Sequence, residues 1–116
     1  MKRLAVLFLA LGCLNPCIAF AVGAIAVDDQ RGDRDPAYGF AIGERNRQAA
    51  ERKALQYCRE HGQHCKVAVW FETCGAYASS RKFYGYGYGS TMAKATTEAL
   101  RHCGRHECKL VVAKCE

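Results

Sequence analysis

The sequence predicts an α+β domain made of two tandem β-β-α-β repeats that pack as one pseudo-twofold, disulfide-stapled unit. Three observations predict it: short segments recur in the same order, each copy alternates between strand and helix periodicities, and cysteines recur at matching positions. With 116 residues, the chain has room for one such domain. The first repeat covers about residues 23–74 and the second about residues 75–116.

The first 21 residues have the three parts of a secretory signal peptide. Residues 1–3 form a positively charged start, residues 4–11 are an unbroken apolar run, and residues 19–21 form a small-x-small cleavage signal. The apolar run is too short to span a bilayer, which needs about 20 residues. We therefore expect an exported protein, periplasmic or secreted, with a mature domain over residues 22–116 and no stable membrane span. Processing as a lipoprotein at Cys13 is the alternative.

Removal of the signal peptide leaves six cysteines and lowers the formal net charge from +6 to +4, because Lys2, Arg3, Cys13 and Cys17 are removed with it. An even number of cysteines in a short exported chain is typical of a disulfide framework. The remaining positive charge is scattered along the chain. It favours an acidic partner or an anionic surface and gives no indication of nucleic-acid binding.

Five segments of the first repeat return in the same order in the second. The pairs are residues 23–26 and 75–78, 38–43 and 84–89, 54–58 and 99–103, 65–69 and 108–112, and finally Cys74 and Cys115. The offset between partners shrinks along the chain, so the two copies differ in the lengths of their connections. A unit of this size cannot bury a core alone, so we expect the two copies to pack together.

The first repeat is predicted to contain three strands and one polar loop, namely residues 23–27, 38–42 and 66–71 and residues 28–37. A helix should run from Arg47 to about residue 60, with Asn46 as its N-cap and Gly62 to end it. Residues at helical spacing should form its inward face: Ala50, Ala54, Tyr57 and Cys58.

The second repeat is predicted to follow the same order, with strands at residues 75–78, 84–88 and 108–114. Its helix should run over residues 91–103, with Ser90 or Thr91 as the cap and Gly104 as the stop. The inward face of this helix should consist of Met92, Ala95, Ala99 and Cys103.

In each repeat, one cysteine ends the helix, one opens the next strand and one closes that strand. This symmetry predicts three disulfides: Cys58–Cys65, Cys103–Cys108 and Cys74–Cys115. The first two should each clamp a helix end to the following strand, and the third should tie the two repeats together. A zinc site is the alternative, but the spacings fit no CxxC pattern, so we expect neither a metal site nor a cofactor.

Four histidines lie beside the two predicted clamps: His61, His64, His102 and His106. One interpretation is a metal or acid–base site at one end of the domain, with Glu60 or Glu107 as the carboxylate partner. The alternative is that they are solvated loop residues, which the absence of a ligand motif or triad spacing favours.

Tyrosine and glycine alternate over residues 84–89, which places Tyr84, Tyr86 and Tyr88 on one face of the strand. One interpretation is an aromatic platform for a glycan, a peptide or a protein surface. The alternative is a buried face, which the corresponding large residues of the first repeat favour: Tyr38, Phe40 and Ile42. The glycine face would then allow close approach of another segment.

Six basic residues lie in loops and helix starts: Arg31, Arg34, Arg45, Arg47, Arg81 and Lys82. One interpretation is an anion-binding rim, and the alternative, which we favour, is a solvated surface. The sequence contains no phosphate-binding loop and no serine elbow.

The repeated elements resemble an exported bacterial family catalogued as domain of unknown function 4189. The resemblance rests on residues 23–27, 38–41, 54–58, 65–69 and 74–78 and on their second-half counterparts at residues 99–103 and 108–112. It covers essentially the whole mature chain. It implies an exported single-domain protein without assigned chemistry, and it assigns no catalytic residues.

These observations favour a non-enzymatic binding module of the cell envelope or secreted fraction, with a protein partner. One specific form is a periplasmic inhibitor or immunity-type protein that blocks a toxin or hydrolase. The alternatives are a small, nuclease-like hydrolase that uses the histidines with Lys66 or Lys109, and a secreted effector.

Overall fold

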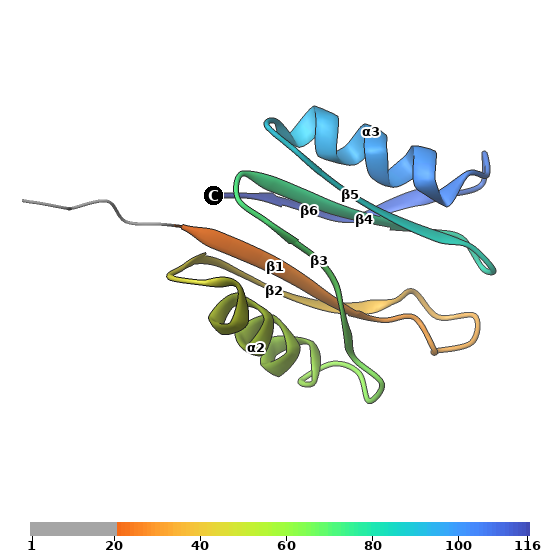
Figure 1. Ribbon diagram of the computed structural model, residues 1–116. Helices are drawn as coiled ribbons and strands as arrows, with labels where there is room; N and C mark the ends of the chain where they lie inside the picture. The colour runs from red at the N-terminus through yellow and green to blue at the C-terminus, as the bar shows by residue number, and fades with distance from the viewer. Residues whose placement is uncertain (1–20) are drawn as a thin grey trace, which may run out of the picture.

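The computed structural model describes residues 21–116, so the predicted signal peptide lies almost wholly outside the described residues. The mixed α+β chain forms eight elements in the order β1 (Val22–Asp28), β2 (Ala37–Glu44), α2 (Arg47–Cys58), β3 (Lys66–Phe71), β4 (Cys74–Ser79), β5 (Tyr84–Gly89), α3 (Met92–Cys103) and β6 (Lys109–Cys115). Figure 1 shows that the elements of each half of the chain stay together.

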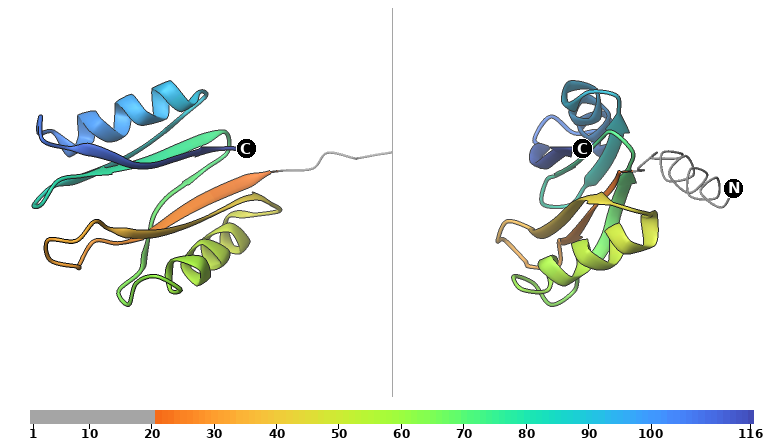
Figure 2. Two further views of the ribbon diagram at one scale, coloured as in Figure 1. Left: turned by 180° about the vertical axis from the view of Figure 1, so that it is seen from behind. Right: turned by 90° about the vertical axis from the view of Figure 1, so that its left-hand side faces the viewer.

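The six strands form two antiparallel sheets, each with three strands. Sheet A has the order β2-β1-β3 and sheet B the order β5-β4-β6, so the first strand of each half is central. Helix α2 covers the outer face of sheet A and α3 covers the outer face of sheet B, which gives four layers (Figures 1 and 2). The β2, β3, β5 and β6 strands are therefore edge strands.

Alanines allow each helix to lie close to its sheet. Ala50, Ala54 and Cys58 of α2 are fully buried against Ala24 and Ala26 of β1. Tyr57 was expected on this inward face, but its side chain is 44 % exposed, so that prediction was wrong. Small side chains suffice on the covered face, and a tyrosine there would separate the layers.

Helix α2 begins as predicted and ends earlier than predicted. The Asn46 side chain accepts a hydrogen bond from the Ala49 N–H at 2.8 Å, but the helix ends at Cys58. Gly62 was expected to end it in a left-handed conformation, yet its φ is not positive. A Cβ on Gly62 would instead collide with the Asp28 carboxylate, so this glycine serves close packing.

The N- and C-terminal ends of helix α3 are those predicted from the sequence. The Thr91 hydroxyl accepts from the Lys94 N–H at 3.1 Å, and Gly104 ends the helix with a left-handed φ of 77°. Ala95, Ala99 and Cys103 face sheet B. Met92 was expected to face inward, but it is the first residue of the helix and is 48 % exposed, so that prediction was wrong.

Three disulfides join the cysteine pairs expected from the sequence: Cys58–Cys65, Cys103–Cys108 and Cys74–Cys115. The expected role of the third was wrong. Cys74 opens β4 and lies directly opposite Cys115 of β6, so this bridge closes sheet B and does not tie the two halves together. Only residues 72 and 73 separate β3 from β4, so Cys74 already belongs to the second sheet.

Large side chains fill the space between the two sheets. The cluster consists of Ile25, Val27, Val69, Phe71, Tyr77 and Val112. Phe71 lies against both Gly23 and Gly75, where a Cβ on either glycine would collide with its ring. The two sheets are thus held together by burial of apolar side chains and not by a disulfide.

Candidate binding surface

The tyrosine–glycine alternation of β5 places the two residue types on opposite faces of an edge strand. Gly85 and Gly87 are buried beneath α3, where a Cβ on Gly85 would collide with the backbone of Ala99 and Cys103. This close contact leaves no room for a side chain on that face. The tyrosines therefore all project toward the other face, on the side of sheet A.

The three tyrosines are largely accessible to solvent. The exposed fractions of Tyr84, Tyr86 and Tyr88 are 52 %, 45 % and 66 %, so the interpretation that they form core was wrong. The physical reason is the position of β5 at the edge of its sheet, where sheet A only partly covers it. We call Tyr84, Tyr86 and Tyr88 the tyrosine row.

A network of contacts holds the Tyr84 end of the tyrosine row. The ring of Tyr84 stacks on that of Tyr77, with 6.2 Å between the centroids, and the Lys66 ammonium lies 5.2 Å from the centre of the Tyr84 ring. The Tyr77 hydroxyl donates a hydrogen bond to Asp29 at 2.8 Å, and Lys66 lies 3.8 Å from the same carboxylate. Burial raises the pKa of Tyr77, and its hydrogen bond to Asp29 raises it further, so it stays protonated.

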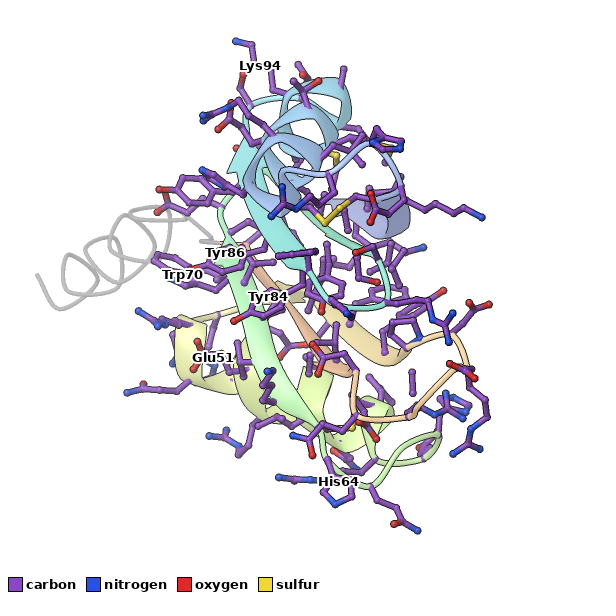
Figure 3. The ribbon with its side chains drawn as sticks, turned by 90° about the vertical axis from the view of Figure 1, so that its right-hand side faces the viewer. Glu51, His64, Trp70, Tyr84, Tyr86 and Lys94 are labelled. Atoms are coloured by element: carbon purple, nitrogen blue, oxygen red, sulfur yellow. A yellow bond between two sulfur atoms is a disulfide. The ribbon has the colours of Figure 1, made fainter. Side chains whose placement is uncertain are left out.

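The surface beside the tyrosine row contains a tryptophan that the sequence analysis did not single out. Trp70 lies on β3, which contacts β5, and Figure 3 shows Trp70, Tyr84 and Tyr86 on the same side of the molecule. The Arg47 guanidinium lies 5.0 Å from the centre of the Trp70 ring and also bonds Glu51 at 2.8 Å. Trp70 itself is partly buried against the core cluster beneath α2, so this side of the domain combines two half-exposed tyrosines and a partly covered tryptophan with positive charge.

The free edge of β5 is closed by a side chain of α3. The Nδ1–H of His102 donates to the carbonyl of Tyr86 at 2.9 Å. The same ring lies 4.0 Å from Glu98, which also binds Arg101. His102 of α3 thus occupies a backbone acceptor that another strand would use. Its role in the structure is to cap the edge of β5.

A family comparison bears on nearly all of the described residues. The model for the family described as Domain of unknown function (DUF4189) matches residues 22–115. The chain belongs to this family. No curated protein and no solved structure matches the chain.

The four histidines of this DUF4189 domain are not assembled into one site. His61 and His64 follow α2, whereas His102 and His106 lie at the end of α3, and the two helices cover opposite outer faces (Figures 1 and 2). His106 is fully exposed and lies 3.8 Å from Glu107. Within residues 21–116, no three His, Cys, Asp or Glu side chains lie close enough to hold a metal ion.

Four of the six basic residues considered for an anion-binding rim have partners in the structure: Arg31, Arg34, Arg47 and Arg81. Arg31 and Arg34 bond to the carbonyls of Asp35 and Arg31 in their own loop, and Arg81 pairs with the exposed Asp33. These contacts, and that of Arg47 with Trp70, are spread over different elements. Asp33 lies between Arg31 and Arg34, so its pair with Arg81 brings these three arginines to the place where the β1–β2 and β4–β5 loops meet. Arg47 lies apart from them on α2, so the four do not form a single rim.

Three disulfides within the described part of a chain this small are typical of proteins that fold in an oxidising compartment. Neither of the two described helices has the length and apolar composition needed to cross a membrane.

Proposed function

We propose that this DUF4189 domain is an exported, non-enzymatic binding module that recognises a protein partner through the tyrosine row. The observation that carries the proposal is the half-exposed row Tyr84, Tyr86 and Tyr88 on a strand whose glycines are seated on α3. Tyrosine offers a large contact area at low conformational cost, which is why it is enriched at the centres of protein interfaces.

The chemistry around the tyrosine row favours a partner with negative charge. Lys66 lies over Tyr84 and Arg47 lies over Trp70, and the mature chain carries a net charge of +4. Both cations remain more than half exposed. A partner with acidic groups around an apolar centre would match this surface. In the specific form of the proposal, this domain is a periplasmic inhibitor or immunity-type protein and the partner is the toxin or hydrolase that it blocks.

Site-specific photo-cross-linking in living cells tests the proposal. A photo-reactive phenylalanine at position 86 should form one discrete adduct with a protein, and the same residue at position 110 should not. Tyr86 and Leu110 are 45 % and 44 % exposed, so the two positions differ in location and not in accessibility. Equal adduct patterns at the two positions, or none at position 86, would contradict the proposal.

The identified partner then allows a quantitative test with purified proteins. Tyr86→Ser should weaken binding by roughly tenfold or more, as for a residue at the centre of an interface, and Leu110→Ser should leave it unchanged. Circular dichroism of both variants establishes that they fold. If both variants lost affinity equally, the loss would reflect reduced stability of the domain and not a contact made by Tyr86.

Export rests on the signal peptide predicted over residues 1–21 and on the disulfides. We expect protein isolated from the periplasm or the medium to begin at Val22, as Edman sequencing or mass spectrometry would measure. A mature chain that begins at a lipid-modified Cys13 would replace this proposal with the lipoprotein alternative.

We also propose that the two halves are copies of one unit related by a pseudo-twofold axis. The strand orders of the two sheets correspond, and equivalent glycines lie on equivalent helix backbones: Gly39 on Ala54 and Cys58, and Gly85 on Ala99 and Cys103. A crystal structure tests this proposal, because superposing residues 22–71 on residues 74–115 should bring Gly39 onto Gly85. A best superposition that matches other strands would contradict it.

A further inference from the structure

A groove of about 700 Å³ runs along the outer edge of β2, on the side of the molecule away from the tyrosine row. One wall is β2 itself, with the side chains of Tyr38 and Ile42, and the other is the exposed face of α2, with Tyr57 in the middle. These three side chains are 38 %, 43 % and 44 % exposed. We call this feature the β2 groove.

Backbone groups of β2 point into the groove. In an antiparallel pair, alternate residues direct their N–H and C=O groups away from the neighbouring strand. In sheet B, Tyr86 lies opposite Tyr77, and its carbonyl points outward to His102. Phe40 has the equivalent position in sheet A, where it lies opposite Ile25. The outward groups of β2 are therefore those of Tyr38, Phe40 and Ile42. Among residues 21–116, no side chain caps the Phe40 carbonyl as His102 caps that of Tyr86.

The other edge strands carry the features that protect edges from pairing with another chain. Strand β3 begins with Lys66, β6 contains Lys109 and Lys114, and β5 is capped by His102. Strand β2 contains no lysine or proline, and its glutamate and its one register shift against β1 both lie at its C-terminal end, beyond Ala41. Among the edges in the described part of the chain, β2 is thus the one open to strand addition.

The wall formed by α2 has opposite charges at its two ends. Lys53 and Tyr57 lie one turn apart on α2, and Glu60 follows in the turn after the helix, where its N–H bonds the Tyr57 carbonyl at 3.2 Å. A cation and an anion thus flank the central aromatic ring of the groove. Lys53 bonds Glu44 at 3.1 Å, but its side chain remains 52 % exposed. A surface with this order is complementary to a copy of itself turned end to end.

We propose that a second copy of this chain occupies the β2 groove, with the two β2 strands paired antiparallel about a twofold axis at Phe40. Tyr38 of one copy then lies opposite Ile42 of the other, an aromatic–β-branched pair that stabilises sheets. Lys53 of each copy lies beside Glu60 of the other. Sheet A of the two copies becomes one continuous antiparallel sheet, and the β2 edge disappears.

The same arrangement brings the two α2 helices into contact. Helix α2 packs against β1 and β2 more than against β3, so its axis lies between those two strands. With strands about 4.8 Å apart, two such helices related by the twofold axis lie roughly 10 Å apart, which is a normal distance for packed helices. Tyr57 of both copies fills the space between them. An unrelated peptide strand would leave this helix face uncovered.

Sedimentation of the purified protein, with its disulfides intact, tests the proposal. The mass should rise from that of the monomer to twice that value as concentration increases, with no larger species. Ile42→Lys should raise the dimer dissociation constant by roughly tenfold or more, because the new charge lies opposite Tyr38 of the other copy. A protein that stays monomeric up to about 1 mM would overturn the proposal.

Tyr88→Lys is the matched control, because Tyr88 has the same position in β5 that Ile42 has in β2. Each lies four residues after the first tyrosine of its strand, Tyr84 or Tyr38. It should leave the dimer intact while weakening the partner binding proposed for the tyrosine row. A dimer lost in Tyr88→Lys and kept in Ile42→Lys would place self-association on β5 and overturn the proposal. The two variants thus test the proposal for the tyrosine row and the proposal for the β2 groove independently.

Chemical cross-linking can detect the proposed pairing of Lys53 of one copy with Glu60 of the other. In a mixture of isotopically heavy and light protein, a zero-length carbodiimide cross-linker should join Lys53 of one copy to Glu60 of the other, as mixed-isotope peptides reveal. Glu60→Lys should weaken the dimer, and adding Lys53→Glu in the same chain should restore it. A double variant that is weaker than Glu60→Lys, with unfolding midpoints unchanged, would overturn the antiparallel arrangement.

Discussion

Asp28 shows how strongly one residue can be misread from a sequence. It is the first residue of a segment rich in turn formers, but it ends β1 and is 2 % exposed. Its carboxylate accepts hydrogen bonds from the N–H groups of Gln30, Gln63 and His64 at 2.9–3.1 Å. One buried side chain thus attaches the connection between α2 and β3 to the central strand.

Burial acts to raise the pKa of the Asp28 carboxyl, but the three backbone N–H groups outweigh it and hold the pKa below its ordinary value. A carboxyl with a lowered pKa in the folded state stabilises the fold above its unfolded pKa. That stabilisation is lost as the pH falls through the folded pKa. The free energy of unfolding should therefore decrease on acidification below about pH 4.

We expect Asp28→Asn to lower the free energy of unfolding at neutral pH by about 2 kcal/mol, because its amide turns a donor toward N–H groups that need an acceptor. It should also flatten the acid dependence of stability. Urea denaturation over a pH series measures both effects. Asp33→Asn, whose side chain is 82 % exposed, is the control and should change little. An Asp28→Asn variant with the acid dependence of the wild type would show that other carboxyls dominate.

At the scale of elements, glycines set the distance between an outer strand and its helix. Gly85 lies directly beneath the backbone of α3, whereas Gly32 lies in the β1–β2 loop with open space around its Cβ position and a φ of 67°. The two glycines are needed for different reasons. The first allows two backbones to approach, and the second allows a left-handed turn.

Alanine substitutions should separate these two roles. Gly85→Ala should destabilise the protein by about 3 kcal/mol, because the new methyl group must displace α3 from sheet B. Gly32→Ala should cost about 1 kcal/mol, since a single residue enters the left-handed region with no steric contact. Thermal unfolding monitored by circular dichroism would rank them. The reverse order would mean that α3 can move outward at little cost.

The disulfides act on loops of different lengths. Cys103 and Cys108 are 5 residues apart in sequence, whereas Cys74 and Cys115 are 41 apart. By loop-closure entropy, replacing both cysteines of the short bridge with alanine should cost about 2 kcal/mol, and the same change in the long bridge about 4 kcal/mol. Denaturant midpoints of the two variants, each with its two remaining disulfides intact, would compare them. Equal losses would indicate residual structure in the unfolded chain.

At the scale of the whole molecule, the two halves depend on the apolar layer between the sheets. Phe71 is 2 % exposed and fills the space above Gly23 and Gly75, one glycine from each sheet. Contacts at the margins add to this layer, among them the bond from the Gly43 N–H to the Glu116 carboxylate and the Lys114 ammonium over the Phe40 ring. No disulfide among the described residues links the two sheets, and their only covalent connection is the chain itself, at residues 72 and 73.

Phe71→Ala should therefore lower the free energy of unfolding by about 3–5 kcal/mol and leave the two halves unfolding in one transition. Hydrogen exchange should accelerate to the same extent in the backbones of β1 and β4. Val69→Ala, at the same layer and 5 % exposed, removes fewer atoms and should cost less. Loss of protection in one half alone would mean that the halves are stable separately.

The sequence predicted one property of the candidate surface, that its tyrosines share a face, but not that this face is exposed. The alternation over residues 84–89 predicted that the tyrosines share one face, because side chains of a strand alternate regardless of its surroundings. Whether that face is core or surface depends on what packs on it, and the counterpart residues of the first repeat favoured the wrong answer. Trp70 was missed because an apolar strand with a tryptophan is indistinguishable from a buried one until its neighbours are known.

The amino-acid sequence alone determined the local features of this protein: its strands and helices, the caps at Asn46, Thr91 and Gly104, and the three cysteine pairs. These follow from backbone chemistry, side-chain periodicity and spacing within about 45 residues. The tertiary structure decided which strands are edges, that Cys74 belongs to sheet B, that Asp28 is buried and that the tyrosine row faces solvent. Exposure is a relation between segments distant in the chain, so no local pattern can contain it.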